Sequence, residues 1–127
     1  MTELASIGGL GDRPAVTLPG MEIAVIEERK GISYLLAADH PEGASKAAFF
    51  EDHGFRRGAW QVLAEALRVH GLRHQVTHIA RSPYGTKYVV DGPLPSPDGR
   101  MPLVRTIWIV DSGAEIPRLV TAYPLDV

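Results

Sequence analysis

The 127-residue chain contains no cysteine, which excludes disulfide bonds, thiolate metal ligands and cysteine nucleophiles. No apolar run is long enough to span a bilayer, and no charged N-terminal region precedes a long apolar stretch, so neither a membrane span nor a secretory signal is predicted. A basic excess is also missing, because the formal net charge is -2. This charge argues against a general nucleic-acid coat but leaves room for a local basic site. We therefore expect a cytoplasmic protein with no membrane partner.

Glycine and proline are plentiful, with 13 and 10 copies, and they divide the chain. Residues 1–20 hold many of them and show no hydrophobic period, which predicts a flexible N-terminal arm. Residues 21–127 are expected to form a single domain, since a chain of this length can bury a core without disulfides.

Three helices are predicted in the first half of this domain, after a short strand. Apolar residues recur at spacings of three and four, which is the period of a buried helical stripe. Ser45 is expected to cap the second helix, Gly54 to end it with a positive φ, and Gly71 to end the third. The predicted strand covers residues 21–26, and the predicted helices cover residues 28–37, 46–53 and 59–70.

Four strands are predicted in the second half, rich in β-branched and aromatic residues. They cover residues 75–81, 86–90, 103–110 and 118–123, and residues 91–102 are expected to form a loop because they hold four prolines and two glycines. Strands joined by short links pair antiparallel. The sequence thus predicts an α+β fold, with about three N-terminal helices packed on one face of a four-stranded, mainly antiparallel sheet formed by the C-terminal half.

Two polar residues at the start of the second helix are candidates for chemistry. His40 precedes a proline and a bend, and a histidine held there is suited to act as a general acid or base. Lys46 lies in the first helical turn, where the helix dipole disfavours a cation, which suggests an oxyanion or phosphate contact. The plain alternatives are a helix-capping or solvated histidine and an ordinary solvated lysine.

A second group of candidates lies on the strands. Arg118, Thr121 and Tyr123 share the last strand, and the side chains of Thr121 and Tyr123 point the same way. A row of hydroxyls beside a cation can hold a phosphate or stabilise developing charge. The predicted substrate-binding residues beside them are Thr106, Trp108 and Lys87. The alternative is that Thr, Tyr and Trp are there for their β-propensity alone.

Three histidines, His70, His74 and His78, are spaced by four and would share one face of a continuous helix, as metal ligands do. The predicted helix end at Gly71 breaks that face. No metal ligand and no cofactor are therefore predicted.

Several motifs together resemble a family of uncharacterised bacterial domains of unknown function. They include His40-Pro41-Glu42-Gly43 with Ser45-Lys46-Ala47, Gly54-Phe55, Trp108 and the ending Pro117-Arg118-Leu119-Val120-Thr121-Ala122-Tyr123-Pro124. The resemblance covers about residues 18–124. Similar domains resemble C-terminal segments of phage-head and polymorphic-toxin proteins, and those toxin segments are similar to the barnase–EndoU–colicin–RelE group of small ribonucleases.

The resemblance implies catalytic roles for His40 and Lys46, with Arg118, Thr121 and Tyr123 on the last strand. It leaves two functions open. The first is a toxin-like, metal-independent ribonuclease whose partner is RNA. The second is a non-catalytic module that binds a protein partner, as an immunity protein or antitoxin pair does. Convergence of these side chains in one place favours the enzyme, and their separation onto opposite faces favours the binding module.

Overall fold

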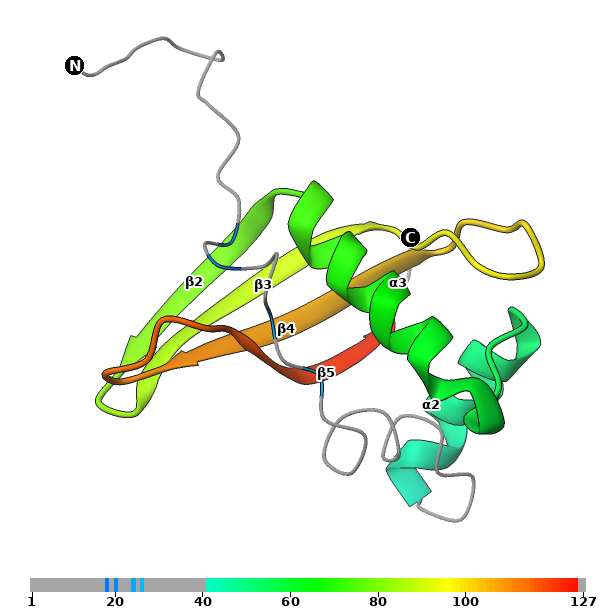
Figure 1. Cartoon of the computed structure of the whole chain (residues 1–127), viewed down its shortest axis with the longest axis horizontal. Coiled ribbons are helices and arrows are strands. Elements are labelled where there is room, and N and C mark those ends of the chain that lie inside the picture. Colours follow the sequence, from blue (N-terminus) through cyan, green and yellow to red (C-terminus); the bar gives the residue numbers. More distant parts are fainter. Residues whose placement is uncertain (1–17, 19, 21–23, 25, 27–40, 126–127) are drawn as a thin grey trace, which may run out of the picture.

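The computed structural model describes residues 18, 20, 24, 26 and 41–125, with the backbone alone for residues 41–45 (Figure 1). In chain order its elements are α2 (Pro41–Asp52), the short 3-10 helix η4 (Arg57–Ala59), α3 (Trp60–Arg73), β2 (Val76–Ser82), β3 (Gly85–Pro93), β4 (Leu103–Asp111) and β5 (Arg118–Pro124). The strands form one antiparallel sheet in the order β2-β3-β4-β5. The predicted α+β fold, with helices before a four-stranded antiparallel sheet, is confirmed.

Parts of the prediction fall on residues that the structure does not describe. The predicted helix at residues 28–37 lies outside the described residues, as does most of the predicted strand at residues 21–26. Two α-helices are therefore described where about three were expected. Within the described part of the chain, no helix is long and apolar enough to cross a membrane.

Helix α2 starts earlier than predicted and ends where predicted. It begins at Pro41, so Ser45 lies inside the helix and not at its cap. A proline is tolerated in the first turn because its missing N–H would have no helical partner there. At the other end, Gly54 has a φ of 98°, and the N–H of Phe55 donates to the carbonyl of Phe50 at 3.0 Å. This is a Schellman ending, and the rings of Phe50 and Phe55 make the apolar contact that accompanies it.

Helix α3 runs past its predicted end. Gly71 was expected to stop it, but the helix continues to Arg73, and the N–H of His74 still donates to the carbonyl of His70 at 3.2 Å. A glycine inside a helix costs about 1 kcal/mol relative to alanine. Packing of the buried side chains Leu63, Leu67 and His70 against the sheet outweighs that cost.

The core lies between α3 and one face of the sheet. Figure 1 shows α3 crossing the sheet while α2 lies beside the end of β5. Leu18 is also part of this core, and Ala24 and Ile26 pack against it. The rest of residues 1–20, predicted to form an arm, lies outside the described residues except for Gly20. Fully buried side chains of the core are Phe50, Leu63, Leu67, Val90, Leu94, Val104, Trp108 and Ala122.

A register shift between β4 and β5 decides which side chains share a face. Thr121 pairs with Ile107 and Tyr123 with Arg105, whereas Leu119 pairs with Trp108. Since side chains alternate along a strand, Thr121 and Tyr123 lie on the face turned away from α3. Strand β3 also reaches further than predicted, because residues 91–93, expected in the loop, pair with residues 103–105.

Candidate functional site

Polar side chains form a continuous line on the sheet face away from α3. We call this line the polar row, and it consists of Lys46, Thr121, Tyr123, Arg105 and Asp91. Each of these side chains is half-buried, so each is held in place but still reached by solvent. The row starts on α2, crosses the edge strand β5 and ends on β3.

Lys46 is positioned by the helix that carries it. Its neighbours Ala47 and Phe50 are fully buried, which fixes α2 against the domain and directs Lys46 towards β5. Its ammonium donates a hydrogen bond of 2.9 Å to the hydroxyl of Thr121. The same nitrogen lies 6.0 Å from the ring centroid of Tyr123, at the outer limit of a cation–π contact. The three residues thus place a cation, a hydroxyl and a phenol together.

Arg105 provides a second fixed cation in the row. Asp91 accepts hydrogen bonds from the Nε of Arg105 at 2.8 Å and from its Nη2 at 2.9 Å, so the two residues form a bidentate ion pair. The hydrogen bond from Arg105 lowers the pKa of Asp91, and the hydroxyl of Thr77 also donates to that carboxylate at 3.3 Å. Asp91 first, and then the Tyr123 phenol, raise the pKa of Arg105. Arg105 therefore stays charged, with N–H groups beyond those that Asp91 accepts.

Only some of the predicted site residues come together. Lys46, Thr121 and Tyr123 meet as described, whereas His40 lies outside the described residues, next to the first residue of α2. Arg118 lies at the other end of β5, where its guanidinium contacts both oxygens of Asp111 at 2.7 and 3.0 Å. Lys87 is exposed on β3, opposite Ile109.

The structure places Thr106 and Trp108 on the other face, in the core. Both side chains are fully buried under α3, so neither adjoins the polar row as predicted. The indole N–H of Trp108 donates to the hydroxyl of Thr106 at 2.9 Å, and that hydroxyl lies 3.1 Å from Nδ1 of His70. Their role is structural, because each provides a hydrogen-bond partner for the other's polar group inside the core.

His70 completes this buried network. Its Nε2 lies 3.0 Å from the carbonyl of Gly92 and 2.9 Å from that of Val104. Both partners only accept, so Nε2 carries the proton, and Nδ1 accepts from Thr106. Burial lowers the pKa of His70 to about 4, against the two carbonyls that raise it. His70 is therefore neutral at pH 7.

Two of the three histidines, His70 and His74, bind backbone carbonyls, whereas His78 is exposed on β2 with its Nδ1 3.2 Å from the hydroxyl of Thr77. His74 follows the end of α3, and its Nε2 lies 3.0 Å from the carbonyl of Pro93. Its ring covers Gly92 so closely that a Cβ there would lie 2.5 Å from it. Among the residues that the structure describes, no group of three or more His, Asp or Glu side chains could hold a metal ion.

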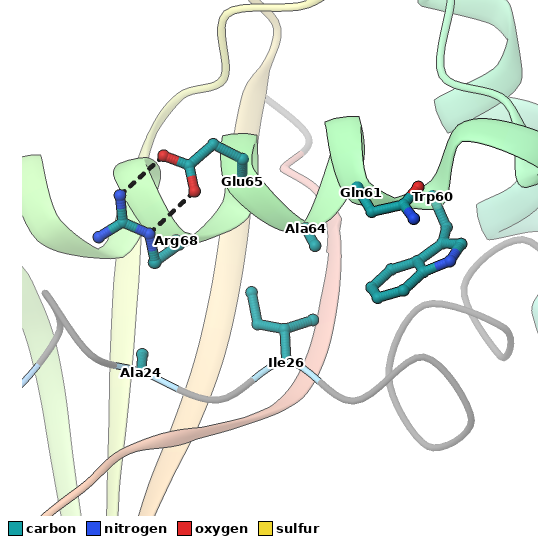
Figure 2. A pocket seen from close by; sticks show the side chains of 7 residues that line it. All are labelled: Ala24, Ile26, Trp60, Gln61, Ala64, Glu65 and Arg68. Atoms are coloured by element: carbon teal, nitrogen blue, oxygen red, sulfur yellow. Dashed lines mark hydrogen bonds and ion pairs between the residues drawn. The ribbon is translucent and has the colours of Figure 1, made fainter.

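A shallow hollow of about 190 Å³ lies on the α3 side, away from the polar row. Figure 2 shows Ala24 and Ile26 facing α3 across it, with Trp60 at one end. Glu65 and Arg68 form an ion pair of 2.7 Å at the other end. Among the described residues the lining is mainly apolar, and its two charged side chains, Glu65 and Arg68, are paired with each other.

Arg105 and Asp91 are site residues that the sequence did not single out. Alternation along β4 places Arg105 on the same face as Ile107, but the partner of Arg105 on β5 depends on the register shift, which leaves no simple sequence signal. Asp91 was assigned to a loop, although it continues β3.

No curated protein matches the chain. Among solved structures, it is similar to a chain of a contact-dependent growth inhibition toxin–immunity protein complex from Klebsiella pneumoniae 342, with a TM-score of 0.69 and 15% identity. The match covers 85% of this chain and 98% of that chain, and at this identity it shows the fold alone. Residues 17–126 match the family "Domain of unknown function (DUF6883)". The chain, with its helices, antiparallel sheet and polar row, belongs to the DUF6883 family.

Proposed function

We propose that this domain is toxin-like and cleaves RNA at the polar row, without needing a metal ion. The observation that carries the proposal is the contact of the Lys46 ammonium with the Thr121 hydroxyl, beside the Tyr123 ring and the Arg105 guanidinium. Two cations and two hydroxyl groups within one accessible row suit a phosphodiester, which is anionic and accepts hydrogen bonds.

The chemistry needs few protein groups because RNA carries its own nucleophile. A base removes the proton from a 2′-OH, and the oxygen attacks the adjacent phosphorus. The bond to the 5′-oxygen breaks, and an acid donates a proton to that oxygen. The products are a 2′,3′-cyclic phosphate and a 5′-OH, with one proton taken and one returned. Cations stabilise the negative charge that grows on the phosphoryl oxygens in between.

The residues divide these tasks by their chemistry. Lys46 and Arg105 stabilise the phosphoryl oxygens, and the Thr121 and Tyr123 hydroxyls orient the phosphate. His40 serves as base or acid, a role that rests on its sequence position before α2. Arg118 lies further along β5 and serves as a contact for flanking phosphates, with Lys87.

The decisive test uses matched oligonucleotides in EDTA. Full-length protein is incubated with a labelled RNA and with a DNA of the same sequence, beside a His40→Ala variant. We expect cleavage of the RNA alone, products that end in a 2′,3′-cyclic phosphate, and a slower variant. An unchanged RNA, or cleavage of both strands, contradicts the proposal. Arg57→Ala is the control, because Arg57 is exposed on η4 and outside the row.

A second candidate function is a non-catalytic module with a protein partner. The similar solved structure is a complex of a toxin with its immunity protein, and a net charge of -2 over the whole chain is unusual for an RNA-binding protein. If purified protein leaves RNA intact but a co-expressed toxin is neutralised, this candidate replaces the first.

A further inference from the structure

The outer edge of β2 is an unusually open feature of the sheet. β2 pairs with β3 on one side, and no described strand pairs with its other side. Every residue from Thr77 to Ser82 is exposed. The opposite edge differs, because α2 lies beside β5. Figure 1 shows the β2–β3 turn at the end of the sheet that is far from α2.

This edge lacks most features that prevent strand pairing. Proteins usually blunt an exposed edge with proline, charged side chains, bulges or a covering segment, and of charged side chains β2 carries only Arg81. Residues 76–82 contain no proline and no acidic residue, and the register shift lies only at their start. Ile79 is 45% exposed in the middle of the strand, and Tyr84 is 81% exposed at the turn. No described segment of the chain pairs with this edge, so we take its main-chain N–H and C=O groups as the groups that another extended chain would bind.

Charge gives the edge a preferred partner. All 15 acidic residues of the chain lie outside residues 66–90, whereas this segment holds Arg73, Arg81 and Lys87, besides Arg68, whose charge is paired with Glu65. Arg81 and Lys87 are both exposed. Arg81 pairs with Thr86, and the adjacent Ala80 pairs with Lys87, so the two basic side chains lie on opposite faces of the sheet beside the edge. A basic edge in an acidic protein attracts an acidic segment.

We propose that the outer edge of β2 binds an extended, acidic segment of a protein partner, which adds a strand to the sheet. A second copy of this chain is a poorer occupant, because it would bring two basic hairpins together. RNA matches the charge but offers no alternating N–H and C=O groups to the edge. The proposal is independent of RNA cleavage, since β2 contributes no member of the polar row.

The test uses a labelled acetyl-(Val-Glu)4 peptide and the full chain, with binding followed by fluorescence anisotropy. Replacing attraction with repulsion at one exposed pair changes affinity by roughly three- to tenfold, so Arg81→Glu is expected to weaken binding by that factor. Arg56→Glu makes the same change of charge at an exposed position away from β2 and is expected to leave binding unchanged.

Two methylated peptides test the strand geometry itself. One peptide carries N-methyl groups on its four Val residues, and the other carries them on its four Glu residues. In an added strand only one set of N–H groups faces β2, so one peptide should lose binding and the other should keep it. Equal behaviour of the two peptides overturns strand addition, as does failure of the parent peptide to bind at about 1 mM, a free energy near -4 kcal/mol.

Other occupants give distinct results that also overturn the proposal. Equal binding of a (Val-Lys)4 peptide removes the charge argument. The edge is assigned to RNA if a single-stranded RNA binds the wild type, if the Arg81→Glu variant no longer binds that RNA, and if the acidic peptide does not displace it. The edge is assigned to a second copy of the chain if analytical ultracentrifugation shows a dimer for the wild type and a monomer for the Ile79→Lys variant.

Discussion

Mild acid should destabilise this fold through the side chain of His70. The imidazole is fully buried, with Nε2 donating to backbone carbonyls and Nδ1 accepting from Thr106. Protonating Nδ1 removes that acceptor and puts a charge in the core. In the unfolded chain the same ring is hydrated and takes up a proton at an ordinary pKa.

The size of the effect follows from the two pKa values. The folded pKa is about 4 and the ordinary value is 6.5. Between these two pH values the unfolded chain binds the proton and the folded chain does not, so the free energy of unfolding falls as the pH falls. The loss is complete below the folded pKa and amounts to about 3 kcal/mol, with a slope of about 1.2 kcal/mol per pH unit near the middle of the window.

The assay is urea denaturation at half-unit steps of pH, on the wild-type protein and on His70→Gln. Glutamine keeps an N–H for the carbonyls but cannot take up a proton in this range. The difference in slope between the two proteins isolates His70 from the carboxylates. Parallel curves, or an NMR titration of His70 near its ordinary pKa, would refute the reasoning.

Three further predictions follow from single contacts. Gly92→Ala drives a methyl group into the His74 ring, and overpacking of this kind costs about 1–3 kcal/mol in urea denaturation, whereas Gly58→Ala, with open space around it, should cost less. Gly54→Ala forces a side chain into a positive φ and should cost about 1–2 kcal/mol in the same assay. Arg105→Gln should weaken RNA binding and lower the salt slope of log K by about 1, measured by anisotropy at several salt concentrations.

The strands and the end of α2 were predictable because their signals are local. Alternating β-branched residues mark β4 and β5, and Gly54 followed by an apolar Phe55 marks a helix end. These patterns depend on neighbours a few residues away. They therefore predict these elements independently of the tertiary contacts made by the rest of the chain.

The errors have a common physical cause, which is packing between distant segments. Glycine has a low helix propensity and often ends a helix, but packing of α3 against the sheet keeps Gly71 within the helix. Gly92 looks like a loop residue, yet its missing side chain makes room for the His74 ring against β3. Neither neighbour can be identified from the local sequence.

The candidate site shows the same limit. Thr121 and Tyr123 were correctly placed on one face, and Lys46 does reach them. The shift between Ile107 and Trp108 then puts Arg105 beside Tyr123 and leaves Thr106 and Trp108 in the core. A bulge of one residue changes which strand neighbours share a face, and no pattern in the sequence marks it.

The single-turnover rate of RNA cleavage in EDTA tests the account most directly, on the wild-type protein, Lys46→Met and Thr121→Val. If the polar row stabilises the cleaving phosphate, the wild type cuts RNA and Lys46→Met is slower by about 100-fold or more, with a smaller loss for Thr121→Val. Equal rates for the wild type and a Lys46→Met protein of unchanged urea midpoint would contradict it.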